Sequence, residues 1–276
     1  MRIANVAGRA HVIVNGRLVD AARIGLPDDP MALVASLPEQ AGAPVSVPDD
    51  APEVGAVRLG PPVPRPSKIV AVGLNFRSHA EENDLPIPEE PVVFAKWPNS
   101  LCGPEDEVVL PAGRARVDWE AEVVLALARG GRRIPAADAW SYVAGVTCGQ
   151  DISDRAEQFR AMRQFTVAKS YDTFSPIGPQ LVTPDELEDP DDLAVSCRLD
   201  GEEVQASRTS DLIFSVPELI EWVSRYLTLE PGDLIFTGTP GGVGDTRRPP
   251  RYLGPGMLLE TEVEGVGTMR NPCIAG

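Results

Sequence analysis

The segment Val117-Asp-Trp-Glu-Ala-Glu-Val-Val-Leu-Ala-Leu127 decides how this chain folds. Side chains alternate between the two faces of a β-strand. On a strand, one face of this segment therefore carries carboxylates followed by small apolar residues, namely Asp118, Glu120, Glu122, Val124 and Ala126. Because the second half of the segment is apolar on both faces, the pattern predicts a strand in the middle of its sheet.

Carboxylates on a buried strand need a partner. Taking an ion out of water costs several kcal/mol, roughly, and neighbouring carboxylates also repel one another. A divalent cation would remove both penalties, and carboxylate oxygens suit Mg²⁺, Mn²⁺ or Ca²⁺. The alternative is a solvated acidic face, which is how we interpret the equally spaced acids of residues 260–264. For Glu120 and Glu122, spacing alone leaves both interpretations open.

A third carboxylate, Asp151, ends an apolar segment that we expect to form a strand. A helix capped by Ser153 is predicted to follow and to run through Met162. Spacings of three and four residues place Arg155, Gln158 and Met162 on one face of that helix. An acid with an arginine and a glutamine behind it indicates the edge of a site. The alternative is a surface turn followed by a solvated helix.

The rest of the chain is rich in strand patterns and poor in helices. Asn15-Gly16 predicts a hairpin over residues 11–20, a short helix is expected near residues 30–37, and Ser215-x-x-Glu218 opens another helix. Without a run of alternating strands and helices, the pattern favours a strand-rich α+β fold. Further strands are predicted at Ile69–Gly73, Val92–Ala95, Val108–Leu110, Trp119–Ala128, Gly145–Asp151, Ala194–Leu199, Asp233–Thr237 and Leu258–Val266.

Residues 43–67 are dense in Pro, Asp and Gly and show little periodicity, which indicates a linker or an extended wrapping segment. We therefore predict a boundary near Arg65. Residues 1–65 would form a small N-terminal α/β piece with its linker, and residues 66–276 the main domain.

The composition argues against several classes of function. With a net charge of −16 and a pI near 4.6, nucleic acid and anionic membrane surfaces are not expected partners. No segment approaches the ~20 apolar residues of a membrane span, and the N-terminal stretch lacks a signal-peptide core, so we expect a cytoplasmic protein. Its four widely spaced cysteines are expected to be reduced and mostly buried. Only three of the 25 basic residues are lysines, which suggests special roles for Lys68, Lys96 and Lys169.

Six blocks of sequence, taken together, resemble the fumarylacetoacetate hydrolase family. They occur in the family's order over about residues 66 to 270. No single block is decisive, but their joint occurrence is highly specific. The blocks are KIVAVGLNFRSHAEE (68–82), FAK (94–96), DWEAE (118–122), DISDRAEQ (151–158), AKSYDTFSPIGP (168–179) and PGDLIFTGTPGGVG (231–244).

The resemblance implies a mixed β-sandwich or roll, a homodimer and a divalent cation, Mg²⁺ or else Mn²⁺ or Ca²⁺. Larger animal members use a fourth carboxylate ligand, whereas residues 71–75 contain no acid here, so three ligands are implied. These ligands fall on Glu120, Glu122 and Asp151.

The resemblance also implies catalytic roles for His79 as general base, Glu82 as its partner acid, and Lys169. Substrate-binding roles are implied for Arg155, Gln158 and Thr239, the last in the glycine-rich loop at residues 237–240. From the residues alone, the polar stretch around His79 predicts a mobile loop or lid. An exposed helical turn with an incidental His–Glu pair is the alternative.

The implied activity is metal-dependent hydrolysis of a carbon–carbon bond in 2,4-dioxo acids such as acylpyruvates or fumarylpyruvate, through an enolate held at the metal. The same site could stabilise that enolate after loss of CO₂ or during a double-bond shift. Alternatives are therefore an oxaloacetate decarboxylase or an isomerase of the 2-hydroxyhepta-2,4-diene-1,7-dioate type. A catalytically silent binding protein on the same fold is an alternative from another class.

Overall fold

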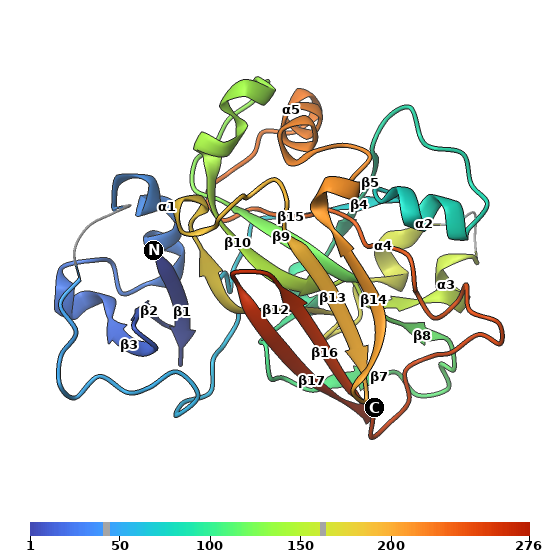
Figure 1. The fold of residues 1–276 in the computed structure, drawn as a ribbon, viewed down its shortest axis with the longest axis horizontal. Helices are drawn as coiled ribbons and strands as arrows, with labels where there is room; N and C mark the ends of the chain where they lie inside the picture. The colour runs from blue at the N-terminus through green and yellow to red at the C-terminus, as the bar shows by residue number, and fades with distance from the viewer. Residues whose placement is uncertain (41–44, 161–163) are drawn as a thin grey trace.

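A ten-stranded mixed sheet runs through the middle of the molecule and faces a second sheet of five strands (Figure 1). The computed structural model describes residues 1–40, 45–160 and 164–276. The large sheet has the order β3-β2-β1-β12-β10-β9-β15-β4-β5, with β6 paired to β12. Its strands are β1 (Arg2–Val6), β2 (Arg9–Val14), β3 (Arg17–Asp20), β4 (Ile69–Gly73), β5 (Val92–Lys96), β6 (Leu101–Cys102), β9 (Ala121–Leu127), β10 (Val143–Gln150), β12 (Ser175–Val182) and β15 (Leu234–Phe236).

The second sheet has the order β14-β13-β16-β17-β7, and two short strands, β8 (Val117–Asp118) and β11 (Ser153–Asp154), pair separately. The five strands are β7 (Val108–Leu110), β13 (Ala194–Leu199), β14 (Glu202–Arg208), β16 (Leu258–Val263) and β17 (Gly267–Ala275). The helices are α1 (Pro30–Gln40), α2 (Arg77–Glu82), α3 (Arg155–Gln158), α4 (Phe165–Ala168) and α5 (Val216–Tyr226). The prediction of a strand-rich α+β sandwich is confirmed.

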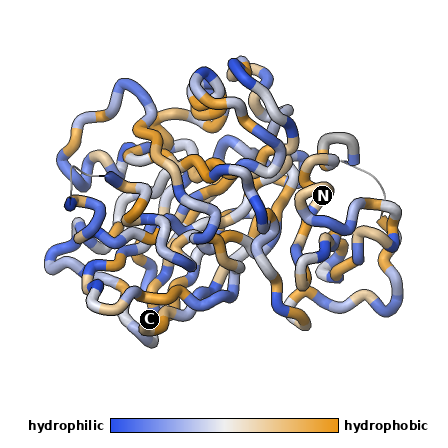
Figure 2. Tube along the Cα trace, turned by 180° about the vertical axis from the view of Figure 1, so that it is seen from behind, coloured by the Kyte–Doolittle hydropathy of each residue, from blue (hydrophilic) through white to orange (hydrophobic). Residues whose placement is uncertain are grey.

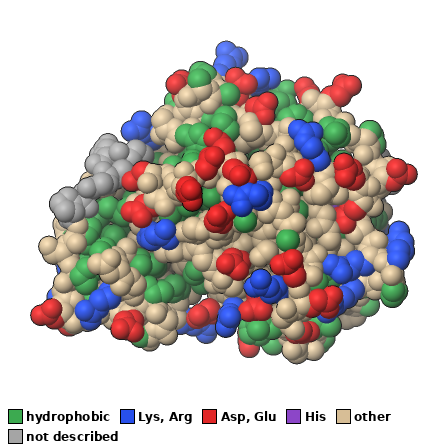
Figure 3. Space-filling view, in the orientation of Figure 1, with side chains coloured by type: hydrophobic (Ala, Val, Ile, Leu, Met, Phe, Trp, Pro, Cys, Tyr) green, Lys and Arg blue, Asp and Glu red, His purple; other side chains and the backbone are tan. Residues whose placement is uncertain are grey.

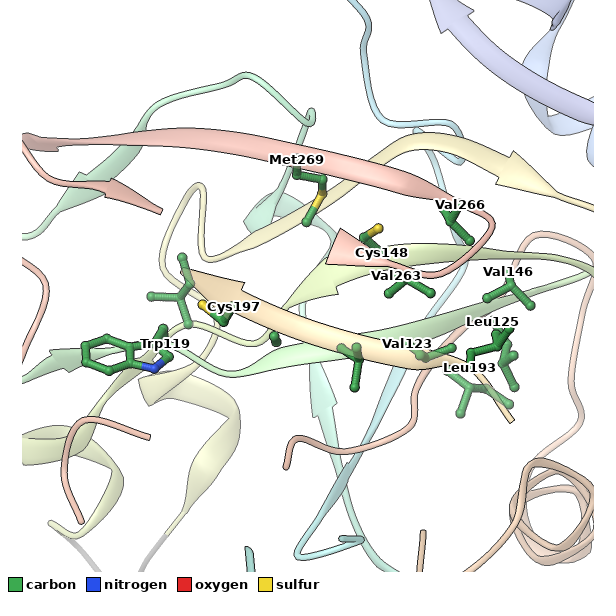
Figure 4. Close-up of a cluster of buried hydrophobic side chains, with 14 of the residues drawn as sticks. Trp119, Val123, Leu125, Val146, Cys148, Leu193, Cys197, Val263, Val266 and Met269 are labelled. Atoms are coloured by element: carbon green, nitrogen blue, oxygen red, sulfur yellow. The ribbon is translucent and has the colours of Figure 1, made fainter. Parts of the chain in front are cut away.

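The two sheets enclose an apolar core. Figure 4 shows side chains from both sheets in contact there, with those of β9 and β10 on one side and those of β13, β16 and β17 on the other. Burying one large apolar side chain contributes about 1.5–3 kcal/mol, so this layer holds the sheets together. Figure 2 shows the same separation along the chain, with apolar segments inside and hydrophilic loops at the margins.

The central strand β9 is buried on both faces, as its sequence predicts. It pairs with β10 on one side and β15 on the other. Val123 and Leu125 face the core between the sheets, whereas Val124 and Ala126 belong to a second apolar cluster that includes Leu33 of α1. Strand β9 is therefore held in place by apolar packing on both of its faces.

The acidic segment is not one continuous strand. We predicted a strand over Trp119–Ala128, but the structure has a break between Asp118 and Ala121. At the break, the backbone N–H of Trp119 donates to Asp118 Oδ1 at 2.9 Å, and that of Glu120 donates to Gln150 Oε1 at 2.9 Å. Side-chain oxygens thus take the place of a neighbouring strand.

The N-terminal piece extends the large sheet, because β1 pairs with β12. The predicted hairpin is confirmed as β2 and β3, joined at Asn15 and Gly16, whose φ angles of 50° and 76° are those of the expected tight turn. The helix predicted near residues 30–37 is confirmed as α1. Residues 43 and 44 of the predicted linker lie outside the described residues, and the division near Arg65 stays a prediction.

The helix predicted from Ser153 through Met162 was wrong in its length and its cap. Ser153 and Asp154 form β11, and α3 ends at Gln158 after one turn. Asp154 is the N-cap instead, since its side chain accepts from the backbone N–H of Ala156. Met162 lies outside the described residues.

The surface carries both signs of charge. Figure 3 shows acidic and basic side chains side by side across the face in view. An example of such pairing is Arg208, which lies within 3.0 Å of both Asp192 and Glu264. Within the described ranges, no helix combines the length and the apolar character needed to cross a bilayer.

Candidate functional site

Three buried carboxylates meet where β9 begins and β10 ends. The two strands are antiparallel, with Glu122 opposite Gly149, so Asp151 comes to lie beside the paired glutamates. One oxygen each from Glu120, Glu122 and Asp151 lies within 4.8 Å of the others, and none of the three residues is more than 6 % exposed. The structure thus brings together the three residues predicted as metal ligands.

Two lysines lie against this cluster. Lys169 Nζ donates to Glu120 Oε2 at 2.7 Å and to Asp151 Oδ2 at 2.6 Å. Lys96 Nζ donates to the other oxygen of Asp151 at 2.6 Å, and also to the backbone carbonyls of Lys169 and Phe174. Both lysines are almost fully buried. They fix the direction in which Asp151 points.

The charges in the cluster explain two opposite pKa shifts. Burial, together with repulsion from Asp151 and Glu120, raises the pKa of Glu122 well above its usual value. Burial also opposes ionisation of Glu120, but the neighbouring Lys169 and Arg155 outweigh it and hold the pKa of Glu120 below its usual range. Glu122 is therefore the carboxylate that lacks a compensating positive charge.

The residues of the cluster fit a divalent cation. Four buried carboxylates (Asp118, Glu120, Glu122 and Asp151) lie against three buried cations (Lys96, Arg155 and Lys169), which leaves one net negative charge when all are ionised. The donor atoms are all carboxylate oxygens, which hard cations such as Mg²⁺ and Mn²⁺ prefer. An ion among these oxygens would remove the repulsion that raises the pKa of Glu122.

Arg155 connects the cluster to a fourth acid, Asp118. Its Nη1 lies 2.7 Å from Glu120 Oε1 and its Nε donates to Asp118 Oδ2 at 2.8 Å. Arg155 Nη1 also donates to Gln158 Oε1 at 2.9 Å. Asp118 accepts further bonds from the backbone N–H groups of Gly244 and Asp245. Asp118 thus contacts Arg155 and the glycine-rich loop, and the three-carboxylate cluster does not include it.

His79 lies on helix α2, so the expectation of a loop around it was wrong. Its Nδ1 lies 2.6 Å from Glu82 Oε1, three residues along the same helix. The other oxygen of Glu82 accepts from the backbone N–H of Gly242 at 2.8 Å and from Thr246 Oγ1 at 3.1 Å. Burial opposes ionisation of Glu82, but the bonds from His79 and Gly242 outweigh it and lower its pKa. The carboxylate can therefore fix the ring orientation of His79.

A cavity of about 240 Å³ joins these groups. This volume is below the usual range of roughly 300–1,000 Å³ for drug-sized ligands, so a small substrate fits best. Six of the predicted site residues line the cavity, whereas Glu82, Glu122 and Asp151 lie behind its wall. The six are His79, Glu120, Arg155, Gln158, Lys169 and Thr239.

Sequence reasoning missed how two groups support the cluster. Lys96 was singled out by the rarity of lysine and belonged to one of the six resembling blocks, but its bond to Asp151 was not predicted. The backbone N–H of Gly238 donates to Glu122 Oε2 at 2.7 Å. Gly238 has a φ of +106°, and a Cβ there would lie 2.8 Å from the side chain of Asn75. The glycine-rich loop therefore needs glycine at this position in order to approach the cluster.

Comparison with known proteins gives a consistent result. The family model for the fumarylacetoacetate (FAA) hydrolase C-terminal region matches residues 68–274. Over 213 residues the chain is 43 % identical to the mitochondrial oxaloacetate tautomerase Fahd2a of Rattus norvegicus, covering 77 % of this chain and 68 % of that protein. Over 217 residues it is 45 % identical to the 2,4-didehydro-3-deoxy-L-rhamnonate hydrolase of Sphingomonas sp. (strain SKA58), covering 78 % of this chain and 76 % of that protein.

A solved structure bears on the metal. Maleylpyruvate hydrolase from Sphingobium sp. SYK-6, in complex with manganese(II) ion and pyruvate, matches with a TM-score of 0.83 at 30 % identity, and the match covers 100 % of both chains. This likeness and the cluster of three carboxylates together support a divalent metal in this protein.

Proposed function

Because this chain belongs to the fumarylacetoacetate hydrolase family, we propose that it is a divalent-metal-dependent hydrolase that cleaves a carbon–carbon bond in 2,4-dioxo acids of the acylpyruvate type. One observation carries the proposal: His79, paired with Glu82, lines the same small cavity as Glu120, Arg155 and Lys169. A proton-transfer group and a carboxylate–cation cluster therefore adjoin one space of the right size for a small keto acid.

Glu120, Glu122 and Asp151 would hold the cation. When bound, a divalent cation polarises the oxygens of a 2-oxo acid and offsets negative charge that develops on them. Lys96 keeps Asp151 oriented, and the Gly238 N–H does the same for Glu122. Partners of this kind tune the affinity of a metal site without contacting the metal.

His79 would act as the general base. With Nδ1 bound to Glu82, Nε2 is the nitrogen left to take a proton from water. The resulting hydroxide attacks the carbonyl carbon distal to the substrate carboxylate. The bond between this carbon and the adjacent CH₂ then breaks, and its electron pair forms the enolate of pyruvate. The imidazolium returns its proton to the former CH₂ carbon of this enolate, which gives pyruvate, and the attacked carbonyl carbon becomes that of a carboxylic acid.

Lys169 and Arg155 would stabilise the enolate oxygen and orient the substrate carboxylate. A lysine ammonium has three donor hydrogens. The bonds from Lys169 to Glu120 and Asp151 use two of them, so one remains for a substrate oxygen. Fixed donors aimed at developing charge are among the largest contributions to catalysis. Gln158 and Thr239 complete the polar side of the cavity.

Product analysis tests the proposal. Acetylpyruvate is incubated with the Mn²⁺-loaded protein and followed by proton NMR. We expect pyruvate and acetate to appear in equal amounts, and a chelator to stop the reaction. The variant His79→Gln should lower kcat by about 10²–10⁴-fold. His11→Gln is the matched control, because His11 lies in the β2–β3 hairpin. Absence of metal-dependent pyruvate formation would contradict the proposal.

Keto–enol tautomerisation of oxaloacetate is a second candidate. It is favoured by the 43 % identity to the rat mitochondrial oxaloacetate tautomerase. His79 would take a proton from the CH₂ carbon of oxaloacetate, and the oxygen of the adjacent ketone would gain a proton to form the enol. Water would not attack the substrate. Stopped-flow ultraviolet absorbance separates the two reactions: enol decay that the protein accelerates without pyruvate release supports the tautomerase.

A further inference from the structure

We infer that the outer part of the cavity selects keto acids whose far end is uncharged and apolar, and rejects those that end in a second carboxylate. This inference rests on the proposed function, because it concerns the substrate of that same site. Two independent features of the described residues carry it, the composition of the cavity wall and the charge balance around the carboxylate cluster.

Three apolar side chains form one side of the cavity mouth. Leu85, Val92 and Phe159 line it and are 49 %, 43 % and 49 % exposed, which places them at the mouth. Deeper inside, the rings of Phe94 and Phe165 meet edge to face with centroids 5.5 Å apart. Exposed apolar side chains that border a cavity gain most from a ligand that covers them with apolar surface.

The two cations that line the described cavity lie at the carboxylate cluster, where the proposed function assigns them to the 2-oxo acid head of the substrate. Arg155 is bound to Asp118 and Glu120, and Lys169 to Glu120 and Asp151. The described lining residues include no other lysine or arginine. Among these residues, a remote substrate carboxylate would therefore have no cationic partner beyond the two that bind the head of the substrate.

The other charged groups of the lining do not supply one. His79 Nδ1 is bound to Glu82 Oε1, so the protein itself already supplies a carboxylate partner for this ring. The second lining acid, Asp245, accepts from Arg116 Nη2 and from the hydroxyl of Tyr252, both at 2.6 Å. As a carboxylate, Asp245 offers a second substrate carboxylate no cationic partner.

The charge of the cluster points to the same substrate. With all of them ionised, the four buried acids and three buried cations described above would carry one net negative charge. A divalent cation changes this to one net positive charge, which a single substrate carboxylate neutralises. A second carboxylate would restore an uncompensated negative charge in a poorly solvated site, which is unfavourable.

A matched pair of ligands tests the inference without turnover. The acids 2-oxoglutarate and 5-methyl-2-oxohexanoate share the 2-oxo acid head, and an isopropyl group replaces the far carboxylate in the latter. Isothermal titration of both into the Mn²⁺-loaded protein should show at least about tenfold tighter binding of the neutral-ended acid, because the charged end lacks a partner. Equal binding, or tighter binding of 2-oxoglutarate, would overturn the inference.

A positive charge introduced at the cavity mouth tests whether the far end of the substrate binds there. Val92→Arg adds a cation to the cavity lining on the edge strand β5, and Val167→Arg adds the same charge at a valine of α4 outside the lining. In Val92→Arg, the ratio of affinities for 5-methyl-2-oxohexanoate over 2-oxoglutarate should fall at least about threefold or reverse. In Val167→Arg the ratio should stay unchanged. An unchanged ratio in a Val92→Arg protein with a normal thermal melt would contradict the proposed location.

The ligand test and the test of the proposed function fail in different ways. If the protein turns over no 2,4-dioxo acid, the hydrolase proposal is wrong, yet the binding ratio still reports the charge preference. If acetylpyruvate and a carboxylate-ended analogue are cleaved with the same kcat/KM, the hydrolase stands and the inferred selectivity is wrong.

Discussion

Lys96 and Asp151 form an ion pair that is completely enclosed by protein, with Nζ 2.6 Å from Oδ1 and both side chains no more than 1 % exposed. Lys169 pairs with the other oxygen of Asp151, so two lysines bind one carboxylate. The compact ammonium group, unlike a guanidinium fork, can satisfy one carboxylate oxygen and two carbonyls from a single nitrogen. These two ion pairs fix Asp151 at the end of β10, where it faces the two glutamates.

Removal of Lys96 should destabilise the protein strongly. In Lys96→Met, the buried Asp151 loses one of its two cations, and breaking a buried ion pair by deleting one partner costs about 3–5 kcal/mol. Urea unfolding monitored by circular dichroism measures the loss. Arg23→Met is the control, since Arg23 pairs with Asp50 at the surface and should contribute no more than about 1 kcal/mol. If Lys96→Met lowered the free energy of unfolding by no more than the control, the Lys96–Asp151 ion pair would not have this stabilising role.

Loss of the Glu82 charge should impair proton transfer while leaving the metal site intact. In Glu82→Gln the imidazolium of His79 loses its counter-charge, so we expect kcat for acetylpyruvate cleavage to fall by about 10- to 100-fold. Mn²⁺ affinity should not change, because Glu82 lies outside the carboxylate cluster. Glu81→Gln, one residue earlier on the same helix, is the matched control. Equal activity in both variants would exclude a role for the Glu82 carboxylate.

The contribution of Glu82 to stability should depend on pH in a defined direction. Its pKa in the folded protein lies below the usual value of 4.5. The stabilisation is therefore complete above that value and is lost as the pH falls through the lower, folded-state pKa. The difference in free energy of unfolding between wild type and Glu82→Gln should shrink as the pH falls below 4.5, because Glu82 then takes up a proton. A difference that grows on acidification would contradict the shift.

Metal uptake should release protons. The raised pKa of Glu122 means that the metal-free protein retains a proton there above the pH at which an ordinary glutamate loses it. A metal ligand must be deprotonated, so binding expels this proton and the apparent Mn²⁺ affinity rises with pH. Titration calorimetry in buffers of different ionisation enthalpy measures the release. Heats that are independent of the buffer would show that Glu122 is already ionised.

The same shift predicts how the stability of the metal-free protein responds to pH. A carboxyl group whose folded-state pKa is raised binds more protons folded than unfolded, so stability falls as the pH rises above 4.5. The melting temperature without metal should therefore decline towards alkaline pH, and saturating Mn²⁺ should reverse the decline. A melting temperature that rises with pH in the chelated protein would oppose this account.

Local pattern was enough to predict the core of the fold. The run of apolar residues on both faces of β9 predicted its central position and its two buried faces, and Asn15-Gly16 predicted the first hairpin. Ser215 and Glu218 form the predicted capping box of α5. These features depend on residues close together in the chain, where periodicity and turn chemistry act directly.

Features that depend on contacts between residues far apart in the chain could not be predicted from the sequence. The strand β12 was missed because Pro176 and Pro179 interrupt its pattern, although β1 and β10 pair with it in the fold. The break at Trp119 and Glu120 depends on Gln150, which lies on another strand. Likewise, the bond from Gly238 to Glu122 joins residues far apart in sequence. No local propensity encodes such contacts.

The candidate site shows the same limit. The three acids were placed together through the resemblance of six sequence blocks, whereas spacing alone allowed a solvated face. The burial that distinguishes Glu122 from the exposed Glu262 arises from the sheet on one side and the glycine-rich loop on the other. That distinction becomes visible only in three dimensions.

The central claim is that Glu120, Glu122 and Asp151 together hold one divalent cation. Titration of the metal-free protein with Mn²⁺, with free ion counted by electron paramagnetic resonance, tests it most directly. We predict one tightly bound ion per chain in the wild type and in the control Glu262→Gln. In Glu122→Gln the affinity should fall by more than about 100-fold, since even groups that only orient ligands contribute 10- to 100-fold. Unchanged affinity and stoichiometry in Glu122→Gln would contradict the claim.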